Sequence, residues 1–226
     1  MDFVFMLTRD DATVANALEI VEAVRPLSLS HIGFKDIGAE PEILRRLTAA
    51  IRESGAKVWM EIVSTSREDE LRSIALGKNL CVDFLMGGVG AEEGVRLLDG
   101  SATRYLPFAG NPVGHPTKLG GAAEAVEAHC RTFAELGCAG VDILAYRATE
   151  ADPLDLVAAC RRGFGDKGLV VAAGSIDCAD RIFALHGAGA DAFTIGTAAI
   201  DCVYAPNAGP LEAQLKAVLG DCAACM

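Results

Sequence analysis

The sequence predicts an α/β barrel in which eight strand–helix units close around one core. Eight short apolar runs recur along the 226 residues, helical patterns separate them, and no change of composition divides the chain. Strands that alternate with helices form a parallel sheet, because each helix carries the chain back to the same edge. Eight such units close into a (β/α)₈ barrel, whose usual length is about 250 residues. Residues 1–226 are therefore predicted to form a single domain.

The predicted strands are short and rich in β-branched or aromatic residues, which is typical of buried strands. They cover residues 3–8, 31–36, 57–63, 81–87, 104–109, 141–147, 169–174 and 192–198. A doubly wound open sheet is the alternative architecture. That fold usually shows G-x-G-x-x-G after its first strand, whereas the first strand here runs into TRDDAT.

Helical spacing separates these strands, most clearly in 41–53 and 121–136. A further helix begins near Cys178, and we expect it to end at Gly187, since glycine commonly follows the last helical turn. The first of these helices is expected to bury one face, formed by Ile43, Leu47, Ala50 and Ile51.

A repeated pattern supports a sheet of like units. FAELGCAGVDILAY (133–146) and FALHGAGADAFTIG (183–196) share Phe-Ala, two glycines and an aspartate that leads an apolar strand. The final part recurs in CVDFLMGG (81–88). The aspartates fall at the amino ends of their strands, the end of a barrel associated with stability. Structural roles are therefore expected for Asp83, Asp142 and Asp191.

Composition excludes several classes of protein. A net charge of -11 disfavours nucleic acids and anionic membranes as partners. No apolar stretch reaches the roughly 18 residues of a membrane span, and the amino terminus carries acids where a secretory signal needs bases. A cytoplasmic protein is expected, and a homo-oligomer is compatible with the sequence.

Eight cysteines are scattered through apolar segments, so they are interpreted as reduced thiols that pack like small hydrophobic groups. Cys222 and Cys225 form the one C-x-x-C pair, for which the sequence indicates no role. A zinc site needs about four ligands. The sequence therefore predicts no metal, and no cofactor.

Two strands end in a glycine followed by a hydroxyl, Gly174-Ser175 and Gly196-Thr197. These are the ends of predicted strands seven and eight, where barrels often bind phosphate. Glycine lets the backbone approach an anion, the hydroxyl adds a donor, and a following helix points its free N–H groups at the same place. Asp177 is interpreted as a helix cap, and residues 198–200 as the start of a short extra helix.

The stretch VAAGSIDCADRIFALHGAGADAFTIGTAAI resembles the phosphate-binding end of the ribulose-phosphate-binding barrels. That superfamily includes sugar-phosphate isomerases of histidine and tryptophan biosynthesis, thiamin-phosphate synthase and related decarboxylases and epimerases. The resemblance covers 169–202 and implies a phosphorylated small substrate held by Gly174, Ser175, Gly196 and Thr197. Catalytic signatures of the better-known members are missing. The resemblance therefore implies the barrel scaffold and the phosphate-binding half of a site, but no particular reaction.

Lys35 and Glu61 are the first candidates for catalysis. Side chains alternate along a strand, and the apolar residues of both strands should face the helices. Lys35 and Glu61 then point toward the barrel mouth, where they could pair. Such a pair could transfer protons, with a contribution of about 10²–10⁴ in rate, or it could be a structural ion pair.

Four further residues are weaker candidates. His115, in the loop after strand five, could move a proton near neutral pH. Tyr146 and Arg147 end strand six, where Arg147 could bind a carboxylate or phosphate. Asp10 lies in the first loop, and its neighbours Arg9 and Asp11 are two more weak candidates. An aspartate that starts a helix is the plainer interpretation there.

The predicted function is that of a metal-independent isomerase or lyase acting on a small phosphorylated sugar or sugar-derived metabolite. Proton transfer is assigned to Lys35 and Glu61. Two alternatives stay open: a class I aldolase in which Lys35 forms a Schiff base, and a non-catalytic barrel that binds a phosphometabolite.

Overall fold

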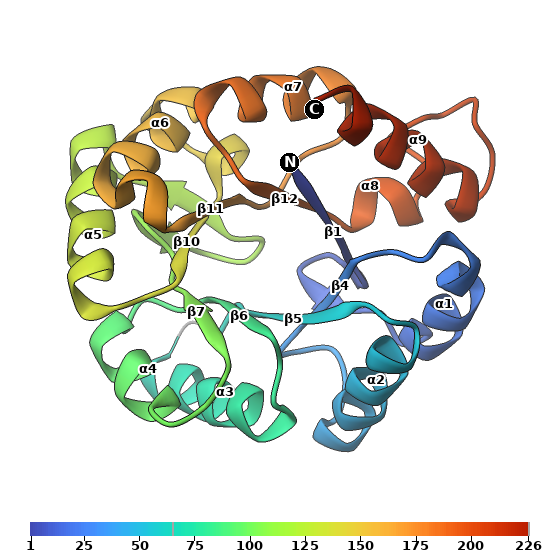
Figure 1. Ribbon diagram of the computed structural model, residues 1–226, viewed down its shortest axis with the longest axis horizontal. Helices are drawn as coiled ribbons and strands as arrows, with labels where there is room; N and C mark the ends of the chain where they lie inside the picture. Colours follow the sequence, from blue (N-terminus) through green and yellow to red (C-terminus); the bar gives the residue numbers. More distant parts are fainter. Residues whose placement is uncertain (65, 226) are drawn as a thin grey trace.

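The computed structural model describes residues 1–64 and 66–225, which fold into a barrel of parallel strands (Figure 1). Its sheet has eight strands in the order β10-β11-β12-β1-β4-β5-β6-β7, which confirms the predicted (β/α)₈ architecture. The strands are β1 (Asp2–Met6), β4 (His31–Lys35), β5 (Lys57–Ile62), β6 (Phe84–Gly87), β7 (Arg104–Leu106), β10 (Gly140–Ile143), β11 (Leu169–Ala172) and β12 (Ala192–Ile195).

The ring closes between β7 and β10 through the residues that follow β7. Phe108 forms a parallel bridge with Asp142. The Ala109 amide donates to the Asp142 carbonyl at 3.2 Å, and the Asp142 amide donates to the Pro107 carbonyl at 3.0 Å. Hydrogen bonds therefore run around the whole barrel.

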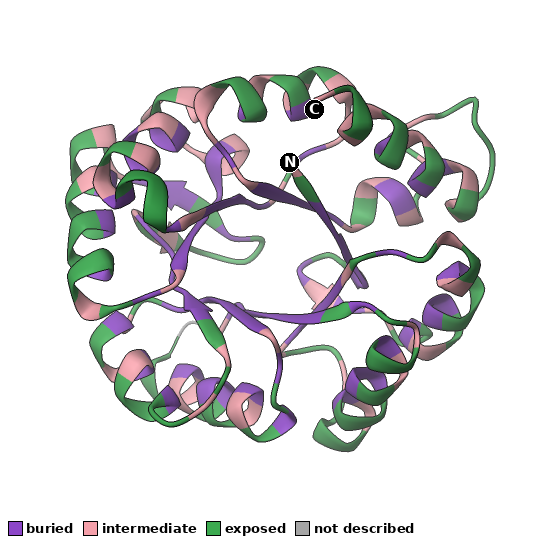
Figure 2. Ribbon diagram, in the orientation of Figure 1, coloured by how far each residue is buried: buried purple, intermediate pink, exposed green. Residues whose placement is uncertain are grey.

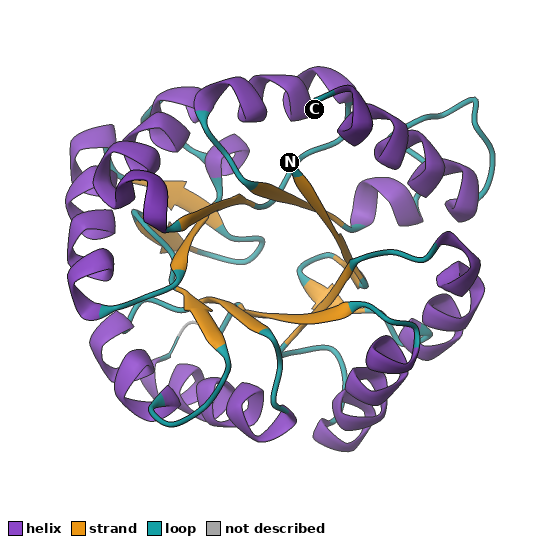
Figure 3. Ribbon diagram, viewed as in Figure 1, coloured by secondary structure: helices purple, strands orange, loops and turns teal. Residues whose placement is uncertain are grey.

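The main helices form an outer ring around the strands (Figure 3). They are α1 (Ala17–Val24), α2 (Pro41–Glu53), α3 (Arg67–Leu80), α4 (Ala91–Leu98), α5 (Ala123–Leu136), α6 (Pro153–Phe164), α7 (Ala179–Ala188), α8 (Thr197–Ile200) and α9 (Leu211–Ala224). Within the described residues, no helix combines the length and the apolar character needed to cross a membrane.

Most strand residues are buried (Figure 2). Their side chains alternate between the two faces of the strand and divide the core into two layers. Phe3 and Phe5 of β1 belong to the large cluster between strands and helices. Val4 and Met6 of the same strand belong to a small cluster inside the barrel. The two faces of each strand are thus buried against different partners, as expected for a parallel sheet covered by helices.

Several predicted boundaries were wrong by a few residues. Strand six ends at Ile143, and Tyr146 and Arg147 lie in the 3₁₀ helix η2 (Ala145–Arg147) instead. Helix α7 continues through Gly187 to Ala188 and ends at Gly189, whose φ is +100°. Only glycine adopts this backbone conformation without strain.

The buried face of α2 was also predicted in part only. Its bounds match 41–53, but the buried residues are Leu44, Leu47, Thr48 and Ile51. Ile43 and Ala50 are half-buried at the side of that face.

Two small hairpins stand at the carboxyl ends of the strands. The first pairs β2 (Thr8–Arg9) with β3 (Ala12–Thr13), so residues 10 and 11 form its turn and do not start a helix. The second pairs β8 (Asn111–Val113) with β9 (Lys118–Gly120) and contains the loop after β7. Both add side chains to the barrel mouth.

Candidate active site at the barrel mouth

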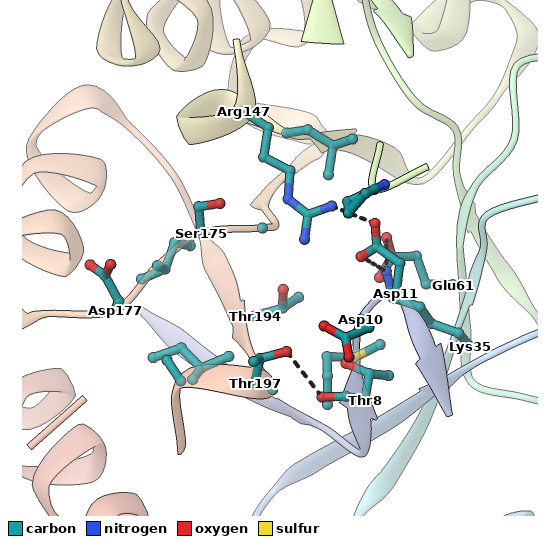
Figure 4. A pocket seen from close by; sticks show the side chains of 18 of the residues that line it. Thr8, Asp10, Asp11, Lys35, Glu61, Arg147, Ser175, Asp177, Thr194 and Thr197 are labelled. Carbon is teal, nitrogen blue, oxygen red and sulfur yellow. Dashed lines mark hydrogen bonds and ion pairs between the residues drawn. The ribbon is translucent and has the colours of Figure 1, made fainter. Parts of the chain in front are cut away.

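A cavity of about 350 Å³ opens at the carboxyl ends of the strands (Figure 4). Lys35 and Glu61 line it, together with Arg147 and Asp10. The two strand ends singled out by the sequence, Gly174-Ser175 and Gly196-Thr197, line the same cavity. One site thus contains the ion pair and both glycine–hydroxyl turns.

Lys35 and Glu61 face the barrel interior from neighbouring strands. They are direct partners in the parallel register of β4 and β5. The Lys35 Nζ lies 3.3 Å from the Glu61 Oε1, and the two residues are only 5% and 3% exposed. The predicted direction and pairing of the two side chains are confirmed. A buried ion pair of this kind must hold both charges in place, since either alone would cost several kcal/mol.

Asp11 joins this pair to Arg147. Its Oδ1 lies 2.9 Å from the Lys35 Nζ, and its Oδ2 lies 2.7 Å from the Arg147 Nη1. The Thr117 amide also donates to Oδ2, at 3.0 Å. Asp10 and Asp11 have φ of 50° and 57°, the backbone that a two-residue hairpin turn requires. The turn therefore places Asp11 over the mouth of the barrel.

The charges in this cluster reinforce one another. Burial opposes ionisation of Asp11, but the Arg147 hydrogen bond and the Lys35 charge outweigh it and hold the pKa of Asp11 well below its usual range. Burial would lower the pKa of Lys35, yet the Glu61 and Asp11 charges outweigh it and raise that pKa. Lys35 is therefore an ammonium group at neutral pH.

The ends of β11 and β12 bring backbone and hydroxyl groups to the opposite side of the cavity (Figure 4). Gly174 has φ +76°, and a Cβ there would lie 2.5 Å from the Arg147 Nε. A Cβ on Gly196 would lie 2.5 Å from the Thr8 Oγ1. Both glycines are thus needed for close packing, and Ser175 and Thr197 after them are exposed.

Residues 197–200 form the predicted extra helix, α8, whose first residues line the cavity. The Ala199 and Ile200 amides donate to the Gly196 carbonyl at 3.0 and 3.1 Å. The first amide groups of a helix have no acceptor within it, so those of Thr197 and Ala198 are the ones available to an anion. Asp177 also lines the cavity but caps no helix: α7 begins after Cys178, and Asp177 pairs with Arg181 at 2.9 Å. The cap assignment for Asp177 was wrong.

Two predicted site residues lie away from the cavity lining. The Tyr146 ring packs beneath the Arg181 guanidinium, whose Cζ lies 4.7 Å from the ring centroid. His115 is exposed in the hairpin loop, where the neighbouring Pro116 reaches the cavity. Their assigned roles in binding and catalysis stay predictions that no contact here supports.

The repeated aspartates divide into two kinds. Asp83 accepts from the Val58 amide at 2.9 Å, and Asp191 accepts from the Val170 amide at 2.8 Å. Both precede their strands, as predicted. Asp142 differs, because it is the third residue of β10 and is completely buried. Its placement at the amino end of a strand was wrong.

Comparison with known proteins supports the fold. No protein-family model matches the chain, and no curated protein sequence matches it significantly. Among solved structures, the tryptophan synthase complex from Pyrococcus furiosus matches with 13% identity and a TM-score of 0.66, over 97% of this chain and 98% of that one. Orotidine 5'-phosphate decarboxylase from Pyrococcus horikoshii matches with 15% identity and a TM-score of 0.64, again over 97% and 98%.

FabK from Thermotoga maritima matches with 18% identity and a TM-score of 0.57, over 87% of this chain and 58% of that one. Identities this low establish a common barrel fold. The barrel fold that the sequence resemblance implied is therefore confirmed.

Proposed function

We propose that this protein is an enzyme that isomerises or cleaves a small phosphorylated metabolite by proton transfer. The observation that carries the proposal is the single cavity in which the Lys35–Glu61 pair faces the glycine–hydroxyl ends of β11 and β12. The matched structures of orotidine 5'-phosphate decarboxylase and tryptophan synthase share this barrel. The carboxyl-terminal end is also where barrel enzymes of many chemistries place their sites.

Each side of the cavity has a separate task in this proposal. Gly174-Ser175 and Gly196-Thr197 hold the phosphate through backbone amides and hydroxyls. Glu61 removes a proton from the substrate, and Lys35 stabilises the negative charge that develops on a carbonyl oxygen. A fixed ammonium group in a buried site is suited to that task, because it is already oriented before charge develops.

The charge state of Lys35 favours this role over a Schiff base. A lysine that attacks a carbonyl must be a neutral amine, which requires a lowered pKa. Asp11 and Glu61 do the reverse and raise the pKa of Lys35. Proton transfer is thus better supported than aldolase chemistry. The third alternative, a barrel that only binds a phosphometabolite, differs from both enzymes because it would show no turnover.

The test is turnover of a panel of phosphorylated sugars and related carbonyl compounds by wild-type protein and Glu61→Gln. We expect kcat to fall about 10²–10⁴-fold for the substrate that reacts. Ser175→Ala and Thr197→Val should raise KM about 3–10-fold, the effect of one lost hydrogen bond each. Glu42→Gln and Thr132→Val change exposed residues on α2 and α5 and serve as matched controls. Wild-type kcat in both Glu61→Gln and Lys35→Met would falsify the assignment of roles.

A further inference from the structure

Asp142 is a buried carboxyl group without a hydrogen-bond partner. Val141 and Ile143 on either side belong to the cluster between strands and helices, so Asp142 faces the barrel interior. It is 0% exposed, and neither carboxyl oxygen has a partner among the described residues. Its register partner on β11 is Val171. An apolar residue at this position would cost less free energy, and an unsatisfied polar group therefore calls for a functional explanation.

The surroundings of Asp142 favour its neutral form. The groups whose charges act on it are Glu61 of β5, Lys35 of β4 and Arg147 of η2. Cys160 of α6 also interacts with it. Burial and the Glu61 charge raise the pKa of Asp142 well above its usual value, against the opposing effect of Lys35 and Arg147.

The charge balance of the cluster leads to the same state. Two cations, Lys35 and Arg147, already face two carboxylates, Asp11 and Glu61. An ionised Asp142 would add a negative charge that no cation compensates. Burial of such a charge costs more free energy than burial of a neutral acid without a partner.

We propose that Asp142 is a neutral carboxylic acid that acts on Glu61 as a positioning residue through its charge state alone: without a hydrogen bond to Glu61, it is the carboxyl group of the two that holds a proton at rest. Glu61 then keeps its pairing with Lys35 and remains available as the base. Pairs of nearby carboxyl groups titrate together in this way, because both cannot ionise at low cost. The inference rests on the proposed function for its catalytic meaning, but not for its charge state.

The proton balance of the reaction follows from this arrangement. The substrate C–H bond breaks, its electron pair moves into an enolate, and the proton forms an O–H bond on Glu61. The two carboxyl groups then hold two protons and no charge. Glu61 returns its proton to the neighbouring carbon while the substrate's own hydroxyl proton passes to the enolate oxygen, so that the carbonyl group forms at the second carbon and the resting state is restored. An ionised Asp142 would instead place a negative charge near the enolate and oppose its formation.

The stability of Asp142→Asn against pH tests the charge state without any substrate. The folded wild-type protein binds one proton more than the unfolded chain once the pH exceeds the ordinary carboxyl value of about 4. Its stability therefore falls with rising pH, relative to a variant that needs no proton. The ratio of the two unfolding constants should change about tenfold per pH unit. The melting temperature of Asp142→Asn should gain about 3–5 °C on wild type per unit.

Two further variants keep this test decisive. Asp142→Val matches the partner residue on β11 and should show the same slope, even if the asparagine amide lowers stability at every pH. Asp83→Asn is the matched control from the repeated motif: it removes the ion pair with Lys57 and should lose stability at neutral pH. A stability difference between wild type and both Asp142 variants that does not change with pH would overturn the proposal.

The catalytic part is tested by the pH profile of kcat/KM once a substrate is known. The kcat/KM of the wild type should fall at high pH as Asp142 ionises, and that of Asp142→Asn should not show this fall. The same fall at high pH in both proteins would overturn the positioning role. Absence of turnover with every compound would reject the proposed function instead, and the stability slope would be unaffected.

Discussion

The two ends of the barrel interior differ sharply, and β5 passes through both. At the amino-terminal end its Trp59 stacks on Phe84 of β6, with ring centroids 3.9 Å apart and planes at 10°. The Trp59 Nε1 also donates to the His31 Nδ1 at 3.0 Å. Two residues later the same face of β5 presents Glu61 to Lys35. Aromatic packing closes one end, and charges occupy the other.

Under the proposed function, this difference separates the residues that stabilise the fold from those that carry out the reaction. The stacked rings lose apolar surface to their neighbours, which stabilises the fold. The charge cluster must remain paired at a considerable desolvation cost and opens onto a cavity. Substitutions at the aromatic end should therefore change stability alone, whereas substitutions at the charged end should also change turnover and the pH dependence.

At the aromatic end we expect a large effect on stability that no second substitution offsets. Trp59→Ala should lower the free energy of unfolding by about 3–5 kcal/mol, since it removes a buried ring from a filled interior. The melting temperature should fall by about 10 °C, as measured by thermal unfolding. Trp59→Phe keeps a ring against Phe84 and should lose less. A loss below about 1 kcal/mol in Trp59→Ala would contradict the assignment of stability to this end.

At the charged end, a pair of substitutions should be less harmful than one. Lys35→Met leaves Asp11 and Glu61 facing each other without their shared cation, at a cost of about 3–5 kcal/mol. The double variant Lys35→Met/Glu61→Leu removes a charge of each sign and should be neutral or more stable than wild type by about 1–4 kcal/mol. Both variants should lose turnover.

Denaturant unfolding of Lys35→Met, Glu61→Leu and the double variant gives this comparison as a double-mutant cycle. The aromatic end offers the contrast, because no second substitution there restores a lost ring. If the costs of the two single changes simply add in the double variant, the charge cluster contributes to stability in the same way as the aromatic packing.

Strand alternation made half of this site predictable. Lys35 and Glu61 stand on strands whose other residues are apolar, so their direction follows from the period of two. Their pairing follows because neighbouring strands of the barrel lie in register. The glycine–hydroxyl ends were equally visible, since each follows an apolar run directly.

The sequence made Asp11 only a weak candidate, because its position depends on a turn. TRDDAT contains two polar residues between short segments that pair as strands, which is the pattern of a two-residue hairpin. The aspartates suggested a helix start instead. Only the left-handed backbone at both positions directs Asp11 toward Lys35 and Arg147. This conformation is set by tertiary contacts such as the bond between the Thr13 amide and the Ile37 carbonyl.

The sequence prediction placed Asp142 wrongly, at the amino end of its strand. The three similar motifs do not start their strands at the same residue. β6 begins after Asp83 and β12 after Asp191, whereas β10 begins at Gly140, two residues before Asp142. At Gly140 a Cβ would collide with the backbone and side chain of Leu169. The glycine therefore permits closer pairing with β11. This brings Asp142 into the strand and turns it inward.

The smallest of the expected stability effects concerns Asp11, and it should run opposite in pH to that of Asp142. The pKa of Asp11 lies below its usual range in the folded protein, so its contribution is present above about pH 4 and is lost as the pH falls through the folded value. Asp11→Asn should cost about 2 kcal/mol at neutral pH, the size of a hydrogen bond to a charged group. The difference in the free energy of unfolding between Asp11→Asn and wild type should disappear at acidic pH.

Thermal unfolding between neutral and acidic pH measures this gap, with Glu42→Gln as a control in which only an exposed pair with Arg45 is lost. A gap that stays constant with pH would mean that Asp11 contributes by packing and not by charge. If both predictions hold, the stability contributions of Asp11 and Asp142 change with pH in opposite directions. This is expected where one carboxylate is held by two cations and the other is left without a compensating charge.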